Sequence, residues 1–279
     1  MEYAGEYPVL QDFDTAYDNM KAISDSSTYP PRWAEQAAAF RGSMRDQGRL
    51  IPDIAYADGA RNHYDLFLPE GDARGTLVYV HGGYWKALDK SFWSHLAQGA
   101  LDRGYRVAMP SYTLCPEVRI CEITREIGRF IDRLAREVDG EIALTGHSAG
   151  GHLVSRMACE NAPIAAATAG RIKRVLSISG LHDLRPLLKT AMNDIFHMDE
   201  AEAVAESAAL QRPRSELRVH CCVGGDELME FRRQNALLAT IWYGLGIETS
   251  AWEIEGTHHC NVIETLADKD SRAVAFLCP

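Results

Sequence analysis

The sequence predicts an α/β fold, with a mostly parallel central sheet flanked by helices on both faces. Two observations carry this prediction. From residue 64 onward, short apolar runs rich in β-branched residues alternate with longer helical patterns, which is typical of crossover units that build a parallel sheet. Several runs, such as residues 77–80, are apolar at every position, as expected for strands that helices cover on both sides.

The expected strands cover residues 64–68, 76–81, 106–110, 141–145, 174–179, 218–223 and 249–254. The clearest helix spans residues 120–138, where isoleucine, leucine and valine recur at helical spacing. Gly140 is expected to supply its left-handed C-terminal cap. Further helical patterns cover residues 90–103, 150–161, 201–210, 230–245 and 271–277.

Residues 1–60 carry the least regular pattern and are expected to wrap the surface or the entrance of a ligand site. Residues 33–45 could form a helix after Tyr29-Pro30-Pro31, because proline fits the first helical turn. No repeat or low-complexity linker divides the chain after residue 60, so residues 61–279 are expected to form one domain with a single large core.

Charge and composition limit the partners. The formal net charge is −10 and no run of Lys and Arg is present, which argues against nucleic acid. No segment reaches the roughly 18 apolar residues of a membrane span, and the N-terminus lacks the pattern of a secretory signal. The expectation is a cytoplasmic protein that acts on a small molecule, with no nucleic-acid or membrane partner. The oligomeric state stays open, a homodimer included.

The seven cysteines form an odd set without paired metal-ligand spacing, so they are predicted to be reduced cytosolic thiols. A metal site at His258, His259 and Cys260 is the alternative, but three consecutive residues rarely meet around one ion. Neither a metal nor an organic cofactor is expected.

Gly146-His147-Ser148-Ala149-Gly150 follows an apolar strand and opens a helical pattern. This context gives the G-x-S-x-G motif its meaning as the nucleophile turn of the α/β-hydrolase fold, with Ser148 as the nucleophile. Glycine is needed two residues on either side of the serine to avoid side-chain collision in a strained turn. The alternative is a glycine-rich connection with an idle serine. His147 is predicted to pack and not to act as the base.

His81-Gly82-Gly83 lies at the carboxyl end of an earlier apolar strand, where such folds place their ligand loops. Two glycines let backbone N–H groups face a bound carbonyl oxygen without an obstructing β-carbon. The N–H groups of Gly82, Gly83 and Ala149 are therefore predicted to form an oxyanion hole. A tight turn that carries exposed aromatic residues is the alternative.

The general base must come last if the chain order of this fold holds, since its triad runs Ser, acid, His. Only His258 and His259 lie near the C-terminus, in a loop after the last expected strand. For the acid, Gly224-Gly225-Asp226-Glu227 offers two adjacent carboxylates, of which only one can reach the base. Asp183 is a third candidate, but it is expected to cap the helix that starts at Leu184.

Three stretches give the chain a resemblance to the kynurenine formamidase (arylformamidase) branch of the α/β-hydrolases. They are His81-Gly82-Gly83-Tyr84-Trp85, Glu230-Phe231-Arg232-Arg233-Gln234 and His259-Cys260-Asn261-Val262-Ile263-Glu264, which are similar to the family's H-G-G-x-W, E-F-x-R-Q and H-F-x-I/V-I-E. The resemblance covers about residue 60 onward. It implies His259 as the base and favours Glu227 over Asp226 as the acid, while Cys260 departs from the usual Phe.

Together these residues predict a serine hydrolase whose catalytic domain spans residues 61–279. The resemblance implies cleavage of an N-formyl aryl amide such as N-formylkynurenine, and a short-chain carboxylesterase is the alternative because the triad chemistry is the same. Tyr84 and Trp85 are predicted to stack the aryl group of the substrate, or else to be core residues. A binding protein that kept the fold and lost catalysis is the rival from another class.

Overall fold

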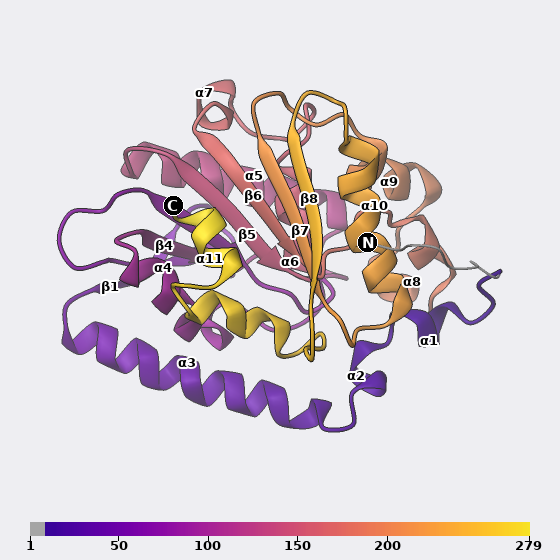
Figure 1. The fold of residues 1–279 in the computed structure, drawn as a ribbon, viewed down its shortest axis with the longest axis horizontal. Coiled ribbons are helices and arrows are strands. Elements are labelled where there is room, and N and C mark those ends of the chain that lie inside the picture. Colours follow the sequence, from indigo (N-terminus) through magenta and orange to yellow (C-terminus); the bar gives the residue numbers. More distant parts are fainter. Residues whose placement is uncertain (1–8) are drawn as a thin grey trace.

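The computed structural model describes residues 9–279, which form one eight-stranded sheet with helices on both faces (Figure 1). The strand order is β1-β2-β4-β3-β5-β6-β7-β8. Strands β3 to β8 are parallel to one another, β2 pairs antiparallel with β4, and β1 pairs antiparallel with β2. The strands are β1 Leu50–Ala55, β2 His63–Phe67, β3 Thr76–Val80, β4 Arg106–Pro110, β5 Ile142–His147, β6 Ile172–Ile178, β7 Arg218–Gly224 and β8 Glu248–Ile254. The predicted mostly parallel sheet is confirmed.

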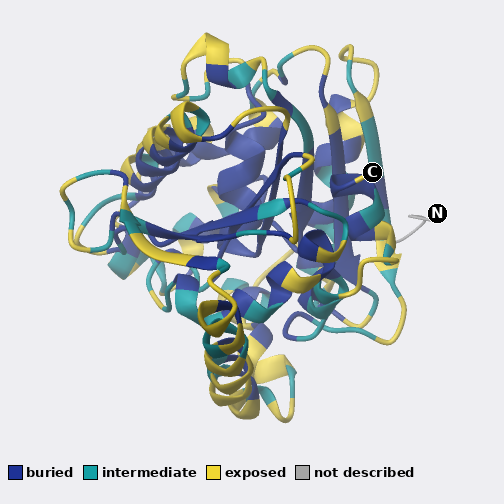
Figure 2. Cartoon of the chain, turned by 90° about the vertical axis from the view of Figure 1, so that its left-hand side faces the viewer, coloured by how far each residue is buried: buried dark blue, intermediate teal, exposed yellow. Residues whose placement is uncertain are grey.

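The side chains of each central strand alternate between two cores. In β3, Val78 and Val80 join the core beneath α5 (Ile120–Glu137), α6 (Ala149–Arg156) and α10 (Met229–Trp242). Leu77 and Tyr79 join the opposite core, beneath α3 (Tyr29–Asp46), α4 (Gln98–Asp102) and α11 (Arg272–Leu277). Figure 2 shows the strands buried between helices whose outer faces are exposed. Because both faces are covered, the central strands are apolar throughout.

The shorter helices complete the layers and the connections. They are α1 Phe13–Tyr17, α2 Asn19–Ala22, α7 Ala166–Ala169, α8 Asn193–Phe196 and α9 Glu200–Glu206, with 3₁₀ turns η1 Ser26–Thr28, η2 Lys90–Phe92, η3 Ser94–Ala97, η4 Arg185–Lys189, η5 Ala208–Leu210 and η6 Val262–Ala267. Among residues 9–279, no helix has the length and apolar character needed to cross a bilayer.

Several local expectations need correction. The helix expected at residues 150–161 ends at Arg156, and residues 201–210 form α9 and η5. Residues 90–103 form η2, η3 and α4 instead of one helix. The helix of residues 120–138 ends at Glu137, with Val138 extended, and Gly140 adopts its positive φ of 83° in the turn beyond the cap. Strand β1 was not expected, because only Leu50 is buried along it and the pattern does not alternate. An edge strand needs little apolar surface, and it tolerates Pro52.

Strand β1 lies within residues 1–60 yet pairs with β2, so the sheet begins before residue 61. Residues 9–49 of that segment follow the outside of the molecule, and residues 1–8 lie outside the described residues. The helix expected at residues 33–45 is α3, which starts at Tyr29 with Pro30 and Pro31 in its first turn and runs along one side of the molecule (Figure 1). An ion pair between Arg41 and the buried Asp65 ties α3 to β2.

The parallel strands bring distant parts of the chain to one edge of the sheet. The loops that follow β3, β5, β6, β7 and β8 all leave from the carboxyl ends of these strands, which is where ligands bind in such sheets. His81, Ser148, Ser179, Glu227 and His259 all lie in these loops. The edge therefore carries the candidate residues His81, Ser148, Glu227 and His259, together with Ser179, which the sequence did not single out.

Candidate active site

Ser148 lies at a sharp turn between β5 and α6. Its backbone has φ 55° and ψ −117°, a region that costs a non-glycine residue conformational energy. The turn is held by the Ser148 N–H, which donates to the Ile178 carbonyl oxygen at 2.8 Å. A β-carbon at Gly146 would lie 2.3 Å from the Gly150 carbonyl oxygen, and one at Gly150 would lie 2.0 Å from that of Val80. Both glycines flanking Ser148 are required by close backbone approach, as the motif predicts.

The loop after β3 packs directly on this turn. A β-carbon at Gly82 would lie 2.9 Å from the His147 carbonyl oxygen and 3.2 Å from Cβ of Ser148. Within residues 9–279, the backbone N–H groups of Gly82, Gly83 and Ala149 have no backbone acceptor, so they are available to a ligand. Amide donors gathered beside a nucleophile are the arrangement that stabilises an oxyanion.

His81 anchors this loop from the side of the core. Its ring stacks on Tyr112 at 4.3 Å between centroids and on Trp93 at 5.6 Å. Nδ1 lies 2.7 Å from the Gly82 carbonyl oxygen. Burial lowers the pKa of His81 to about 4, so the ring stays neutral at physiological pH and serves packing.

The loops after β7 and β8 bring Glu227 and His259 together. Oε2 of Glu227 lies 2.7 Å from Nδ1 of His259. Oε1 accepts hydrogen bonds from the Ser179 hydroxyl at 2.5 Å and the Gly224 N–H at 2.8 Å. These bonds fix the carboxylate, and the carboxylate in turn orients the imidazole of His259. Nε2 of that ring is then free to accept or donate a proton.

Ser148, Glu227 and His259 are all enclosed, with exposed fractions of 2%, 7% and 7%. The ring of His147, next to Ser148, lies 4.5 Å from that of His259 between centroids. Burial, together with the charge that His259 can carry, holds the pKa of His147 well below its usual value, so His147 remains neutral beside the candidate base. Phe231 packs against His259 at 4.9 Å between centroids.

The competing candidates lie elsewhere. Asp226 is exposed, although its backbone N–H donates to the Thr257 carbonyl oxygen. Both ring nitrogens of His258 have other partners: Nε2 lies 3.2 Å from the Tyr29 hydroxyl, and Nδ1 accepts from the Cys260 N–H. Asp183 accepts a hydrogen bond from the Arg185 N–H and pairs with the Arg185 guanidinium. The N-cap position of η4 is Leu184, so the capping role expected of Asp183 is not confirmed.

His258, His259 and Cys260 do not converge on one point, because each contacts a different partner. Within the described chain, no three His, Cys, Asp or Glu side chains are arranged to hold a metal ion. All seven cysteines are free thiols.

Tyr84 and Trp85, the two predicted stacking residues, differ in how far they are buried. Trp85 is fully buried in the core against His152 and Phe196, with ring centroids 5.1 Å and 5.6 Å away. Its indole offers no face to a substrate, so the structure contradicts the stacking role for Trp85 and favours the core alternative. Tyr84 is half-buried, and its hydroxyl donates to the Tyr17 carbonyl oxygen at 2.5 Å. Both residues have positive φ, which turns this segment in a way that the sequence did not indicate.

Residues 13–29, here named the N-terminal strap, lie against the same edge and were not assigned to the site. The Tyr17 hydroxyl donates to Oε1 of Glu230 at 2.5 Å, and its ring lies 6.1 Å from that of Phe231. Sδ of Met20 lies 3.9 Å from Sγ of Cys260. The strap therefore touches the Tyr84 loop, α10 and the His259 loop, as a segment wrapping a site entrance would. These contacts join residues far apart in the sequence, and no local sequence motif predicts them.

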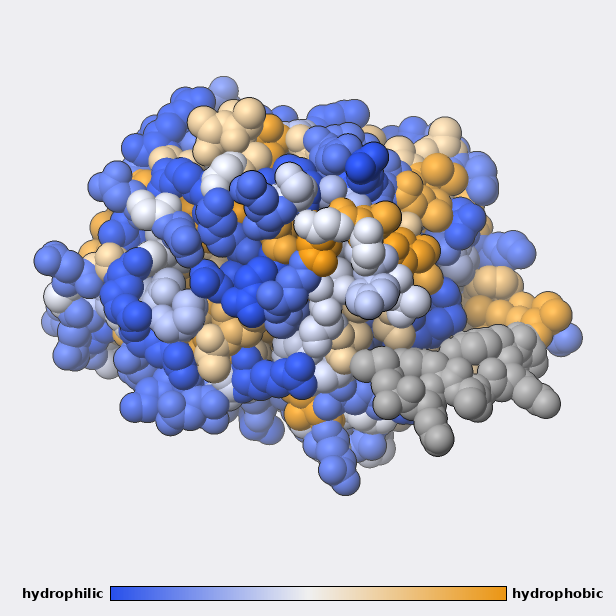
Figure 3. Space-filling view, turned by 45° about the horizontal axis from the view of Figure 1, so that its top comes forward, coloured by the Kyte–Doolittle hydropathy of each residue, from blue (hydrophilic) through white to orange (hydrophobic). Residues whose placement is uncertain are grey.

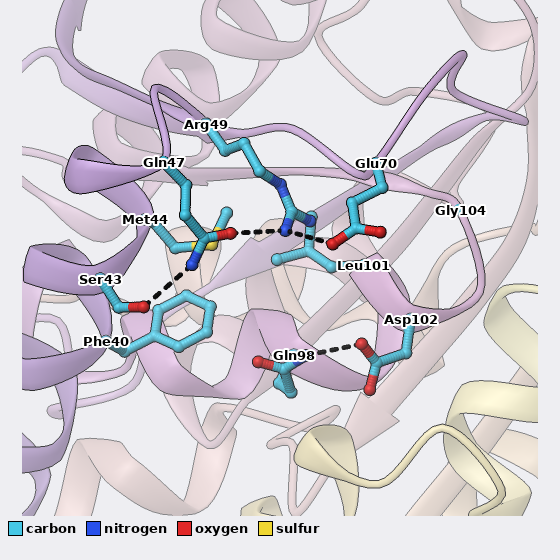
Figure 4. Close-up of a pocket in the computed structure, with 10 residues that line it drawn as sticks. All are labelled: Phe40, Ser43, Met44, Gln47, Arg49, Glu70, Gln98, Leu101, Asp102 and Gly104. Atoms are coloured by element: carbon cyan, nitrogen blue, oxygen red, sulfur yellow. Dashed lines mark hydrogen bonds and ion pairs between the residues drawn. The ribbon is translucent and has the colours of Figure 1, made fainter.

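A separate cavity of about 450 Å³ lies between α3 and α4 (Figure 4). It is lined by polar side chains such as Gln47, Arg49 and Gln98, several of which hydrogen-bond to one another. None of its lining residues belongs to the strap or to the Ser148, Glu227 and His259 loops. The face in Figure 3 is largely hydrophilic, with separated apolar patches.

Comparisons with known proteins match most of the chain. A family model described as BD-FAE matches residues 64–216. A kynurenine formamidase from Salmo salar is 27% identical over 86% of this chain and 85% of its own, and one from Danio rerio is 26% identical over 81% and 80%. A solved structure from a Silicibacter species, provisionally described as a thioesterase, is 47% identical, with a TM-score of 0.91 over 97% of this chain and 100% of its own.

Proposed function

The chain belongs to the BD-FAE family and is a hydrolase of the α/β-hydrolase fold, and from this premise we propose that it removes the N-formyl group of aryl amides through Ser148, Glu227 and His259. The observation that carries the assignment of roles is the Glu227–His259 contact of 2.7 Å in the loops beside the Ser148 turn. The carboxylate, the imidazole and the strained serine follow the chain order of the fold.

In the proposed mechanism, Oγ of Ser148 attacks the formyl carbon while His259 accepts its proton. Glu227 fixes the imidazole tautomer and stabilises the imidazolium that forms. The N–H groups of Gly82, Gly83 and Ala149 stabilise the tetrahedral oxyanion, and each such donor contributes roughly 2.7–4 kcal/mol in a serine protease.

The tetrahedral intermediate then collapses. His259 gives its proton to the amide nitrogen, the C–N bond breaks and the arylamine leaves. His259 takes a proton from a water molecule, which attacks the formyl-enzyme. The C–O bond to Ser148 breaks as His259 returns this proton to Oγ of Ser148, and formate is released. The chain supplies every proton carrier that this sequence of steps needs.

Enclosure of the nucleophile supports a small acyl group. Ser148 is only 2% exposed, and the strap lies over the loop that follows the oxyanion glycines. Formyl is the smallest acyl group, so it fits where a long acyl chain would be excluded. The relatives named kynurenine formamidases support the same substrate class. Tyr84 remains the proposed aromatic contact for the aryl group, without Trp85.

Ester or thioester hydrolysis is the second candidate, because the 47% identical neighbour is described as a thioesterase. The test compares kcat/KM for N-formylkynurenine, a p-nitrophenyl ester of comparable size and an aryl thioester, at one pH and enzyme concentration. The proposal expects the formyl amide to be the best substrate. An advantage of tenfold or more for either ester class would replace it.

A further inference from the structure

The middle of the strap bridges the two loops that carry the reaction. At Tyr17, the carbonyl oxygen accepts a hydrogen bond from Tyr84, which follows the oxyanion glycines. Three residues later, Met20 contacts Cys260, which follows His259. The pKa of Tyr84 is raised chiefly by burial and further by the charges of Asp18 and Glu227. Asp18 of the strap and Glu227 of the candidate triad therefore both lie near Tyr84. Asn19 lies between these contacts.

Asn19 is 3% exposed, and its Nδ2 has no hydrogen-bond partner in the described chain. A buried amide donor is nearly always paired, since an unmade hydrogen bond is costly in the folded state. Asn62 shows the ordinary case in this protein: it is similarly buried, and its Nδ2 donates to Tyr56 and to Glu126. Several other buried side-chain polar atoms also lack a partner in the described chain, but Asn19 lies in the segment that contacts both loops of the candidate active site.

We propose that Asn19 is a specificity-determining residue, whose Nδ2 donates a hydrogen bond to an acceptor oxygen on the leaving group of the substrate. We place this hydrogen bond on the leaving group and not on the formyl group for the following reason. His259 must reach the leaving group to protonate it, and the strap contacts the loop that carries His259 through Met20. A ketone or carboxylate oxygen near the scissile bond would pair with the amide. A leaving group without an acceptor would leave the donor unpaired, as it is in the free protein.

This inference rests on the proposed triad but not on the choice between amide and ester. Two matched substrate pairs therefore test it: N-formyl-2-aminoacetophenone against formanilide, and 2-acetylphenyl acetate against phenyl acetate. Within each pair only the ketone acceptor differs. For each enzyme, the ratio of kcat/KM within a pair measures the preference for the acceptor.

Asn19→Ala and Asn19→Asp both remove the donor. We expect either substitution to lower the acceptor preference roughly three- to tenfold, the effect of one hydrogen bond, with the non-acceptor substrate little changed. The melting temperature should change little in Asn19→Ala, because Nδ2 makes no hydrogen bond in the described chain. A fall in melting temperature with equal losses on both substrates would show a structural role and overturn the proposal.

Tyr17→Phe is the matched control in the strap, because it removes the hydroxyl bound to Glu230 and keeps Asn19. It should change both members of a pair equally. If the wild type cleaves only the esters, the formamidase proposal fails and Asn19 is judged on the ester pair. An unchanged acceptor ratio in Asn19→Ala, on whichever pair is cleaved, would overturn the role of Asn19.

Discussion

The Ser148 turn and the N-terminal strap meet at one site but are built differently. At the turn, the backbone leaves no room: a β-carbon at Gly150 would lie 2.0 Å from a carbonyl oxygen. The strap is held by side-chain contacts from separate elements, such as Tyr17 with Glu230 and Asp14 with the Ala191 N–H. The proposed chemistry therefore depends on glycine positions that cannot accept even a β-carbon. The fit to the substrate depends on side-chain contacts of the strap, which substitution can change.

The largest effect is expected for Ser148→Ala. Turnover should fall on the order of 10⁶-fold, as in a serine protease that loses its nucleophile, because no other group replaces Oγ. The melting temperature should stay close to that of the wild type, since the loss of one hydroxyl hardly changes the packing. Measured kcat and a thermal melt check both points. A mutant with more than a tenth of the activity would remove Ser148 from its role.

The acid gives the next largest effect and separates two adjacent residues. Glu227→Gln should lower kcat roughly 10⁴-fold, because an amide holds the imidazole in the wrong tautomer and cannot stabilise its cation. Asp226→Asn should leave kcat within about twofold, as expected for an exposed carboxylate. Steady-state kinetics of the two variants side by side decide the matter, and the reverse order would transfer the role to Asp226.

Backbone crowding at the turn is tested by stability. Gly150→Ala should destabilise the protein by about 3 kcal/mol or more, because the new β-carbon meets the Val80 carbonyl. Gly170→Ala is the matched control, since its β-carbon would meet nothing closer than 3.6 Å. Urea denaturation compares the two. Equal stability would mean that the turn can shift, and the contrast with the strap would weaken.

Strap contacts should have smaller effects. Tyr17→Phe removes a buried hydrogen bond to a carboxylate and should cost about 1.5–3 kcal/mol, with less than a tenfold change in activity. Arg32→Ala removes an exposed ion pair to Glu264, whose side chains are 49% and 40% exposed, and should cost less than about 1 kcal/mol. Urea denaturation and kinetics report both. A larger loss from Arg32→Ala than from Tyr17→Phe would contradict the idea that the buried contact holds the strap.

The smallest effect on activity is expected at Cys260, where the strap contacts the loop that carries His259. Burial raises the pKa of its thiol to about 12. The group is therefore protonated below that pH, and at pH 8 only roughly one molecule in 10⁴ carries the reactive thiolate. Iodoacetamide at pH 8 should leave activity unchanged over an hour. Progressive inactivation, absent in Cys260→Ala, would show that the strap opens and exposes the thiol.

Local patterns predicted the part of the site whose geometry is local. Gly146 and Gly150 lie two residues from Ser148 and fix its turn, so the sequence alone indicates it. The preference for Glu227 over Asp226 came from family resemblance, since adjacent carboxylates cannot be told apart by spacing. The structure places Glu227 against His259 and leaves Asp226 exposed.

The strap and β1 could not be predicted in the same way. Tyr17 meets Glu230 from 213 positions away, and Met20 meets Cys260 from 240, without any periodic pattern. Strand β1 is an edge strand in which only Leu50 is buried, and Pro52 and Asp53 interrupt its apolar residues, so it lacks the alternation that reveals strands. The stacking role of Trp85 was wrong because positive φ values at Tyr84 and Trp85 turn the backbone and the indole lies in the core.

The central claim is that Ser148 is a nucleophile activated by His259 and Glu227. Reaction with a fluorophosphonate probe, followed by intact mass and peptide mapping, tests it most directly. We expect one adduct per chain, on Ser148, formed rapidly by the wild type, slowly by Glu227→Gln and not at all by Ser148→Ala. No adduct on the wild type, or an adduct on another residue with Ser148 unmodified, would contradict it.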